Sequence, residues 1–285
     1  MARKLSIFAL CLFVVFLLFP WNFLKGIYQS NIQNALANSP VSIDLSNLDI
    51  SSPLHVSASS LTITNKLDGL TFTCEAVDVA ASYLSLLMLE ADISVSGKCL
   101  DGEIKVSAQK GLFSQGNLKF DLQKLNLSKV PFQNLDTQVL GLLDAKGEVS
   151  DIASDNEQGN ANLQVSSFGI DKELVLLSGL IKLPRFSNGS FNADLSKKKD
   201  ILYLKESNLD TILGKVELHG KTTVNYMTQT IEDPGFNGDI ELSTNGHQLI
   251  GGYLALAARS NVENPAKNWE INITGTDINN IRASI

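Results

Sequence analysis

Residues 185–196 read RFSNGSFNADLS, and this stretch shows the pattern that decides the fold. Asn188 and Gly189 both tolerate a positive φ and indicate a turn. After them, apolar residues stand at every second position from Phe191 to Leu195, with polar residues between them. This alternation is typical of a β-strand with one buried face. We therefore predict a turn followed by a strand.

The same two-residue period continues through most of the chain. The pair Asp101-Gly102 is the strongest short hairpin signal. Strand patterns extend to the C-terminus, and only residues 83–91 (YLSLLMLEA) and 172–183 (KELVLLSGLIKL) have continuous apolar runs that fit either a short helix or a buried strand. We predict one β-rich domain over residues 40–285, an elongated, twisted, mostly antiparallel sheet curled into a groove or an open barrel.

The N-terminus carries a different pattern. Residues 5–24 contain no charged residue, and a helix of about 20 residues matches the roughly 30 Å hydrocarbon core of a bilayer. Arg3 and Lys4 precede the run, which predicts a cytoplasmic N-terminus and a body that crosses the membrane. Residues 1–23 are therefore predicted to form a transmembrane anchor. Its anchoring residues are Leu5, Phe8, Leu12, Val15, Leu18 and Trp21.

Two alternatives concern this end of the chain. A cleaved signal peptide shares the basic start and the apolar run, but residues 19–23 (FPWNF) are poor for a small-residue cleavage site, which favours an uncleaved anchor. Residues 24–39 then place apolar side chains at helical spacing and predict a short amphipathic helix. That helix either lies on the membrane surface or caps one end of the sheet.

Composition excludes some classes of function. The chain has 23 Lys and Arg against 30 Asp and Glu, a formal charge of -7, and no basic stripe, which argues against nucleic-acid binding. A G-x-S-x-G nucleophile motif is absent, and His55, His219 and His247 stand without clustered ligands. We predict a protein that is not an enzyme and has no catalytic, metal-binding or cofactor-binding residues.

Cys74 and Cys99 lie in strand-like surroundings of the predicted exported body. In an oxidising compartment they would form a disulfide that closes a loop of about 25 residues and adds about 3 kcal/mol to the stability. The alternative is a pair of unbonded, buried cysteines that act as small apolar residues. The sequence leaves both open.

The inward rows of the predicted strands are the remaining candidate for function. If the sheet closes on itself these side chains are core; if it stays open they line an apolar groove able to hold acyl chains or another protein's hydrophobic edge. The groove candidates are Ile43, Leu45, Ile104, Val106, Leu118, Phe120, Leu122, Val216 and Leu218.

Several of these features together resemble a known family. The basic start, the span ending in FPW (19–21), the segment LKGIYQSNIQNAL (24–36) and the strands VSIDLSNLDISSPLHVSASSLTI (41–63) resemble the N component of the bacterial type II secretion system, in the branch similar to AsmA-like envelope proteins. Residues 183–224 are similar to that family's repeated strand, Gly, strand pattern.

The resemblance implies a single-pass protein of the bacterial inner membrane with a periplasmic β-rich body. It implies a structural or assembly role in type II protein secretion, with the bilayer and other secretion-system proteins as partners. It also implies kinship with groove-shaped lipid carriers, so the alternative function is lipid binding or transfer with phospholipid as partner. No catalytic or ligand residue follows from the family.

Overall fold

A computed structural model shows the fold of the body. It describes residues 20–35, 39, 41–52, 54–66, 71–112, 114–130, 137–152, 154, 156–176, 181–225, 230–276 and 281–284. Of the predicted anchor residues, Leu5, Phe8, Leu12, Val15 and Leu18 lie outside these ranges and only Trp21 lies within them. Within the described ranges, no helix has both the length and the apolar character needed to cross a bilayer.

The first half of the described chain is mostly strand. Its elements are the 3-10 helix η1 (Trp21–Leu24), α2 (Lys25–Ala35), β1 (Val41–Ser46), β2 (Asp49–Ser52), β3 (His55–Asn65), β4 (Thr71–Ala81), α3 (Tyr83–Leu87), β5 (Glu90–Cys99), β6 (Gly102–Gly111), β7 (Gly116–Asn126), the 3-10 helix η2 (Leu127–Lys129) and β8 (Val139–Ile152). The helix predicted within residues 24–39 forms as α2.

The second half continues the same way and ends with a helical insertion. Its elements are β9 (Gln158–Ile170), β10 (Leu174–Leu176), β11 (Ile181–Leu183), β12 (Phe186–Lys198), β13 (Ile201–Thr211), β14 (Gly214–Asn225), β15 (Thr230–Leu242), α4 (Thr244–Gly246), the π-helix η4 (His247–Gly251), α5 (Gly252–Ala257), β16 (Asn268–Gly275) and β17 (Ile281–Ser284). The prediction of a mainly β, antiparallel body is confirmed.

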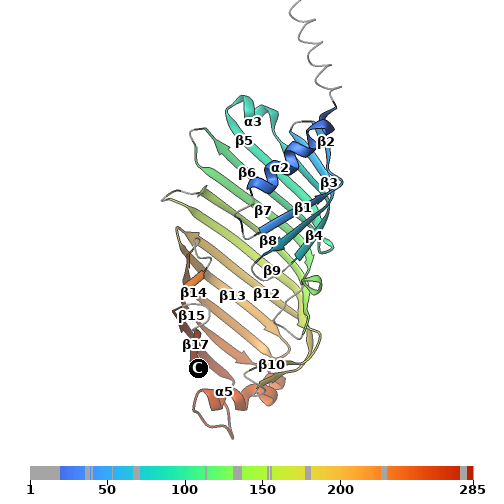
Figure 1. The fold of residues 1–285 in the computed structure, drawn as a ribbon. Helices are drawn as coiled ribbons and strands as arrows, with labels where there is room; N and C mark the ends of the chain where they lie inside the picture. The colour runs from blue at the N-terminus through green and yellow to red at the C-terminus, as the bar shows by residue number, and fades with distance from the viewer. Residues whose placement is uncertain are drawn as a thin grey trace, which may run out of the picture.

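One long sheet holds nearly all the strands, and its order follows the chain. It runs β1-β3-β4-β5-β6-β7-β8-β9-β12-β13-β14-β15-β16-β17, with β2 paired to β3. Every pair is antiparallel, as short connections between neighbouring strands require. The sheet is open and is not closed into a barrel, since its order ends at β1 and β17. Figure 1 shows the resulting elongated body, with colour changing steadily from one end to the other.

Two local predictions are corrected by the pairing. Asn188 has the expected positive φ of 65°, but it lies inside β12 at a register shift between Phe186 and Gly189, so it forms a β-bulge and not a turn. A bulge and a turn use the same local backbone, and only pairing on both sides of the strand separates them. The β5–β6 hairpin turns at Leu100 and Asp101, which both have positive φ, one residue before the predicted pair.

The structure also shows which elements the two continuous apolar runs form. Residues 83–91 form α3, a turn and the start of β5. In residues 172–183, β10 and β11 pair as a separate two-stranded ribbon. The expectation that strands alone continue to the C-terminus is wrong, because α4, η4 and α5 intervene. Ser243 starts them as an N-cap, its Oγ accepting a hydrogen bond from Gly246 N at 3.0 Å.

Helices cover the two ends of the sheet. At the first end, Trp21 and Leu24 pack against the buried cluster of Leu48, Ile50 and Ala58. At the far end, α5 and η4 pack on β15 and β16, with a buried cluster of Leu242, Ala255 and Trp269. Figure 1 shows α2 beside the first strands and α5 at the opposite end of the molecule. The strands between these ends are where the candidate site lies.

Candidate functional site

All nine predicted groove residues lie on the same face of the sheet. Val106 is the register partner of Phe120, and Ile104 is the partner of Leu122. The other members are placed on this face by their own cross-strand partners. From Leu45 the partners on successive strands are Leu61, Cys74 and Cys99. The direct partners of the rest are Ile63 for Ile43, Ala108 and Val149 for Leu118, Leu209 and Ile240 for Val216, and Ser207 and Gly238 for Leu218. We call this surface the apolar face.

One row of the apolar face crosses the sheet without interruption. Its members are direct partners on successive strands from β5 to β16: Val95, Val106, Phe120, Gly147, Ala161, Leu195, Leu204, Gly220, Phe236 and Ile273. Of this row, the sequence reasoning named only Val106 and Phe120 as groove candidates and missed the other eight residues. The alternating patterns around those residues carried the signal, but only register shows that they align.

Most large side chains at the centre of the apolar face are only half-buried. None of the nine predicted residues reaches the buried class, and no large side chain of the described chain is fully buried. Three small clusters of buried residues lie at the two helix-covered ends and around the cysteines, and single buried residues such as Leu125, Ala145, Val165 and Ala193 lie on the strands between them. A sheet normally buries its apolar face against a second layer. In the first half of the described chain, the main helix contacts with strands are those of η1 with β2, α2 with β1, α3 with β5 and η2 with β8.

Polar groups on the apolar face are satisfied locally. Ser207 and Thr222 are buried there, and their hydroxyls donate to the backbone oxygens of Leu218 at 3.2 Å and Glu232 at 2.9 Å. Lys197, at the end of β12, forms an ion pair with Glu157. Because these groups already have partners, the face offers a ligand mainly apolar contact.

Bulges interrupt the regular pairing of the sheet at several places. Register shifts occur where one strand carries an extra residue, and several of these residues have positive φ. They are Ala76, Lys124, Asp151, Ser167, Asn188 and Asp233. A bulge bends its strand and increases the local twist. None of these six residues is glycine, so the sequence gives little sign of where the sheet bends.

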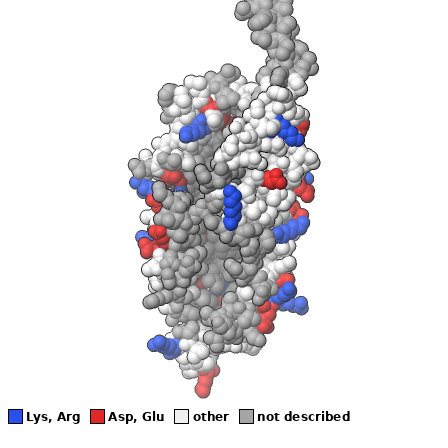
Figure 2. Space-filling model, in the orientation of Figure 1, with Lys and Arg blue, Asp and Glu red and all other residues white. Residues whose placement is uncertain are grey.

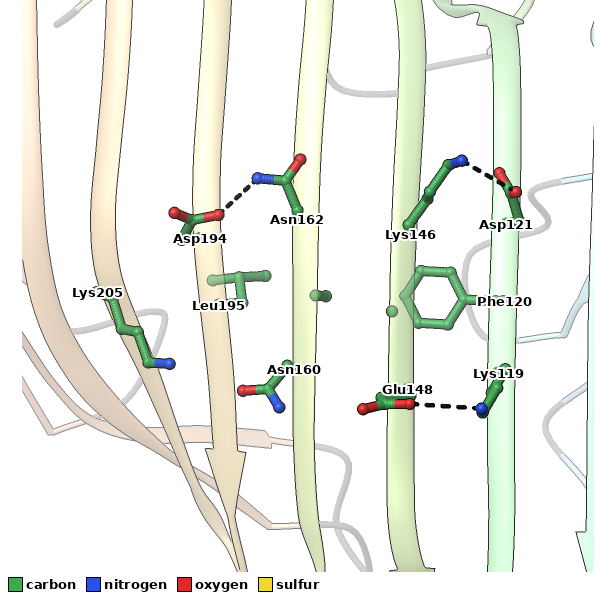
Figure 3. A pocket seen from close by; sticks show the side chains of 12 residues that line it. Lys119, Phe120, Asp121, Lys146, Glu148, Asn160, Asn162, Asp194, Leu195 and Lys205 are labelled. Carbon is green, nitrogen blue, oxygen red and sulfur yellow. Dashed lines mark hydrogen bonds and ion pairs between the residues drawn. The ribbon is translucent and has the colours of Figure 1, made fainter.

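Glycines opposite aromatic residues shape the central row. Phe120 faces Gly147 across β7 and β8, and Phe236 faces Gly220 across β14 and β15. A Cβ at Gly147 would lie 2.5 Å from Cζ of Phe120, so the ring occupies the space that a side chain would fill. Figure 3 shows the Phe120 ring reaching from its own strand to the next. In both pairs the aromatic ring fills the space beside the glycine, so the row stays apolar.

Cys74 and Cys99 are joined by a disulfide on the apolar face. They are register partners on β4 and β5 with Cα atoms 4.2 Å apart, and both are buried. Val77, from the bulge in β4, packs against them together with Leu61 and Ile104. The bond therefore fixes the register directly beside a bulge.

The opposite face carries a polar lattice. Lys119 pairs with Glu148 at 3.8 Å and Lys146 with Asp121 at 3.3 Å, in both cases across β7 and β8. Figure 3 shows these pairs, and the Asn162 to Asp194 hydrogen bond, around a hollow of about 580 Å³. Three basic and three acidic side chains line this hollow, so its formal charges balance.

Two carboxylates at the strand ends have lowered pKa values. The hydrogen bonds from Gln138 N, at 2.7 Å, and Thr137 Oγ1, at 2.8 Å, lower the pKa of Asp171. The hydrogen bond from Lys129, at 2.6 Å, lowers the pKa of Asp101. Both tie a loop to a neighbouring strand, and neither lies on the apolar face.

The histidines occupy ordinary polar positions. His55 Nδ1 lies 2.5 Å from Ser51 Oγ and its Nε2 lies 2.7 Å from Asp78 Oδ1, which links β2, β3 and β4. Both His55 and Asp78 are nearly half exposed, so water reaches this link freely. His247 Nε2 contacts Pro265 O at 2.8 Å. The described residues contain no group of three or more His, Cys, Asp and Glu placed to hold a metal ion.

Comparisons with protein-family models, with curated proteins and with solved structures found no match to this chain.

Proposed function

We propose that this protein is a membrane-anchored, non-enzymatic envelope protein whose apolar face holds the acyl chains of phospholipid. The observation that carries the proposal is the continuous, half-buried apolar row from Val95 to Ile273. Each Å² of apolar surface left in water costs about 25 cal/mol, so a ligand that covers this row gains binding free energy without polar contacts.

Acyl chains fit the chemistry of the row better than a polar small molecule does. The row contains only Val, Phe, Gly, Ala, Leu and Ile. The nearby hydroxyls of Ser207 and Thr222 already donate to the backbone. A polar ligand would lose its water here and find few partners, whereas a hydrocarbon chain loses nothing.

Photocrosslinking of the full chain in cells tests this proposal. Benzoylphenylalanine at Phe120 or Leu204 should form adducts with phospholipid, detected by mass spectrometry. The same group at Lys119 or Lys205 is the matched control, because each control is adjacent in sequence and Lys119 points to the opposite face. Equal yields at Phe120 and Lys119, or no phospholipid adduct at Phe120 and Leu204, would contradict the proposal.

A second role, as a structural or assembly component of a type II secretion system in the inner membrane, is supported by the sequence resemblance. The open sheet adds one favourable observation, since β1 and β17 end the strand order of the described chain and offer edges to a strand of another subunit. Purification of the tagged full chain in mild detergent should then recover secretion-system subunits. Recovery of phospholipid alone would favour the first role.

A further inference from the structure

Exposed apolar side chains gather at one rim of the sheet, around α3. Leu84 is 71% exposed, Met88 72% and Leu89 62%. Leu112, at 67%, lies on the next hairpin, and its N donates to Leu89 O at 3.0 Å. Single exposed apolar residues are common on protein surfaces, but a contiguous group marks an interaction surface. We call these four residues the α3 patch.

The chain enters the described fold beside this patch. Asn22 fastens η1 to β2, because its Oδ1 accepts from Ile50 N and its Nδ2 donates to Asp49 Oδ1, both at 2.8 Å. Just after β2, Leu54 O accepts from Ala81 N at 2.7 Å. Ala81 ends β4 two residues before α3 begins. Figure 1 shows β2 and α3 at the same end of the molecule.

Apolar residues at the end of the predicted anchor and just after it are also exposed. Phe23 is 77% exposed and Ile27 is 55% exposed. The uncharged run of the sequence continues to Leu24, inside η1. Tyr83, at the start of α3, is 46% exposed and is a residue type that favours the membrane interface. Charged side chains also stand at this end in Figure 2, and Glu90 and Lys110 are exposed beside Leu89 and Leu112.

We infer that the α3 patch docks into the interface of the bilayer that the N-terminal segment crosses. This inference depends on the membrane anchoring proposed above but not on lipid in the apolar face. A membrane span that ends at η1 places the bilayer surface at the same end of the molecule as the α3 patch. Apolar side chains at that surface insert into the interface to a depth of about 5–10 Å.

The opposite end of the molecule also carries exposed apolar side chains, but it lies far from η1 and β2, where the described chain begins (Figure 1). Leu256 on α5 is 65% exposed, much like Leu112. Leu249 and Tyr253, in the same uncharged stretch of residues 242–258, are 47% and 41% exposed, and Arg259 follows as an exposed charge. Leu256 is therefore a matched control for exposure without proximity to the anchor.

Docking would place one end of the apolar face at the membrane. Ile93, on β5, belongs to the apolar face through its partner Ala108 and is 42% exposed. It stands four residues after Leu89 of the patch. Acyl chains leaving the bilayer at this rim would meet the apolar face directly.

Depth-dependent quenching tests the inference. The full chain carrying Leu84→Trp or Leu112→Trp is reconstituted in phosphatidylethanolamine and phosphatidylglycerol vesicles that contain lipids brominated near the headgroup end of the acyl chain. Both reporters should be quenched beyond the background of native Trp21 and Trp269, and Leu256→Trp should not be. Adding Met88→Asp to Leu112→Trp should return the quenching to background. All substituted sites are exposed, and circular dichroism checks that the fold is kept.

The outcomes separate the proposals. Protein that floats with the vesicles while both patch reporters stay at background would overturn docking and leave anchoring intact. Protein that does not float would overturn anchoring and docking together. Quenching at Leu256→Trp equal to that at Leu84→Trp would show non-specific adsorption and would also overturn the inference. None of these results depends on crosslinking at Phe120.

Discussion

The ends of the sheet and its centre are built from the same alternating strands, but they differ in how far their apolar side chains are buried. At the C-terminal end, Trp269 is 8% exposed and Ala255 is 0% exposed, because α5 covers β15 and β16. In the centre, Phe120 and Leu204 occupy equivalent positions on the apolar face and stay half-buried. The ends therefore supply tertiary stability, and the centre keeps apolar surface available.

This difference explains how a single-layer sheet of this length remains folded. Sequential antiparallel pairing gives nearly every strand of the main sheet a backbone ladder with the strands next to it in the chain. The end clusters and the disulfide then restrain the regions where that ladder would otherwise fray. If the centre were an ordinary core, substitutions there would cost as much as at the ends.

The largest contrast is expected between Trp269→Ala and Phe120→Ala. Removing the buried indole, whose Nε1 donates to Ala266 O at 2.9 Å, should lower the free energy of unfolding by about 3–5 kcal/mol. Phe120→Ala should cost about half as much, because part of its ring already contacts water. Urea unfolding monitored by circular dichroism measures both. Equal losses would show that the centre is covered.

Loss of the disulfide is expected next in size. The double variant Cys74→Ser, Cys99→Ser should lose about 3 kcal/mol, because the unfolded chain is no longer restrained by the loop. Reducing agent should lower the urea midpoint of the native protein and leave that of the double variant unchanged. If reducing agent left the urea midpoint of the native protein unchanged, this would contradict the restraint proposed for this end of the sheet.

Glycine in the central row gives a smaller, sharper test. In Gly147→Val the new side chain would meet Phe120 and, at 2.7 Å from its Cβ, the backbone oxygen of Asn160, so we expect a loss of about 1–3 kcal/mol. Gly235→Val is the matched control, because a Cβ there meets only Lys221 O, at 3.9 Å. The same unfolding measurement should show little change for the control.

The smallest effect concerns pH. Hydrogen bonds lower the pKa of Asp171 in the folded protein, so the unfolded state binds the proton more tightly. The stability from Asp171 is therefore full above pH about 4 and is lost as the pH falls through the lowered folded pKa. The melting temperature of Asp171→Asn should lie below that of the native protein at pH 7, and the gap should narrow in acid. A gap that widened in acid would contradict this assignment; Glu263→Gln, on an exposed loop, is the control.

Much of the fold follows from local sequence pattern. The two-residue period places Val106, Phe120 and Leu218 on one face whatever the neighbouring strands are, because successive side chains of a strand point to opposite sides. The predicted groove residues therefore share a face in the structure. The end-capping helices were harder to foresee. Gly251 and Gly252 weaken the helical pattern there, and packing of Ala255 against Trp269 overrides it.

The sequence by itself determined the antiparallel β character, the apolar face and the placement of two cysteines in strand-like runs, since these depend on alternation and turn residues within a few positions. Only the tertiary structure decided that Cys74 meets Cys99, that Asn188 is a bulge and not a turn, and that the sheet stays open with its centre half-buried. The physical reason is that register, curl and coverage depend on pairing between distant strands, and a one-residue shift in register changes every partner without changing the local pattern.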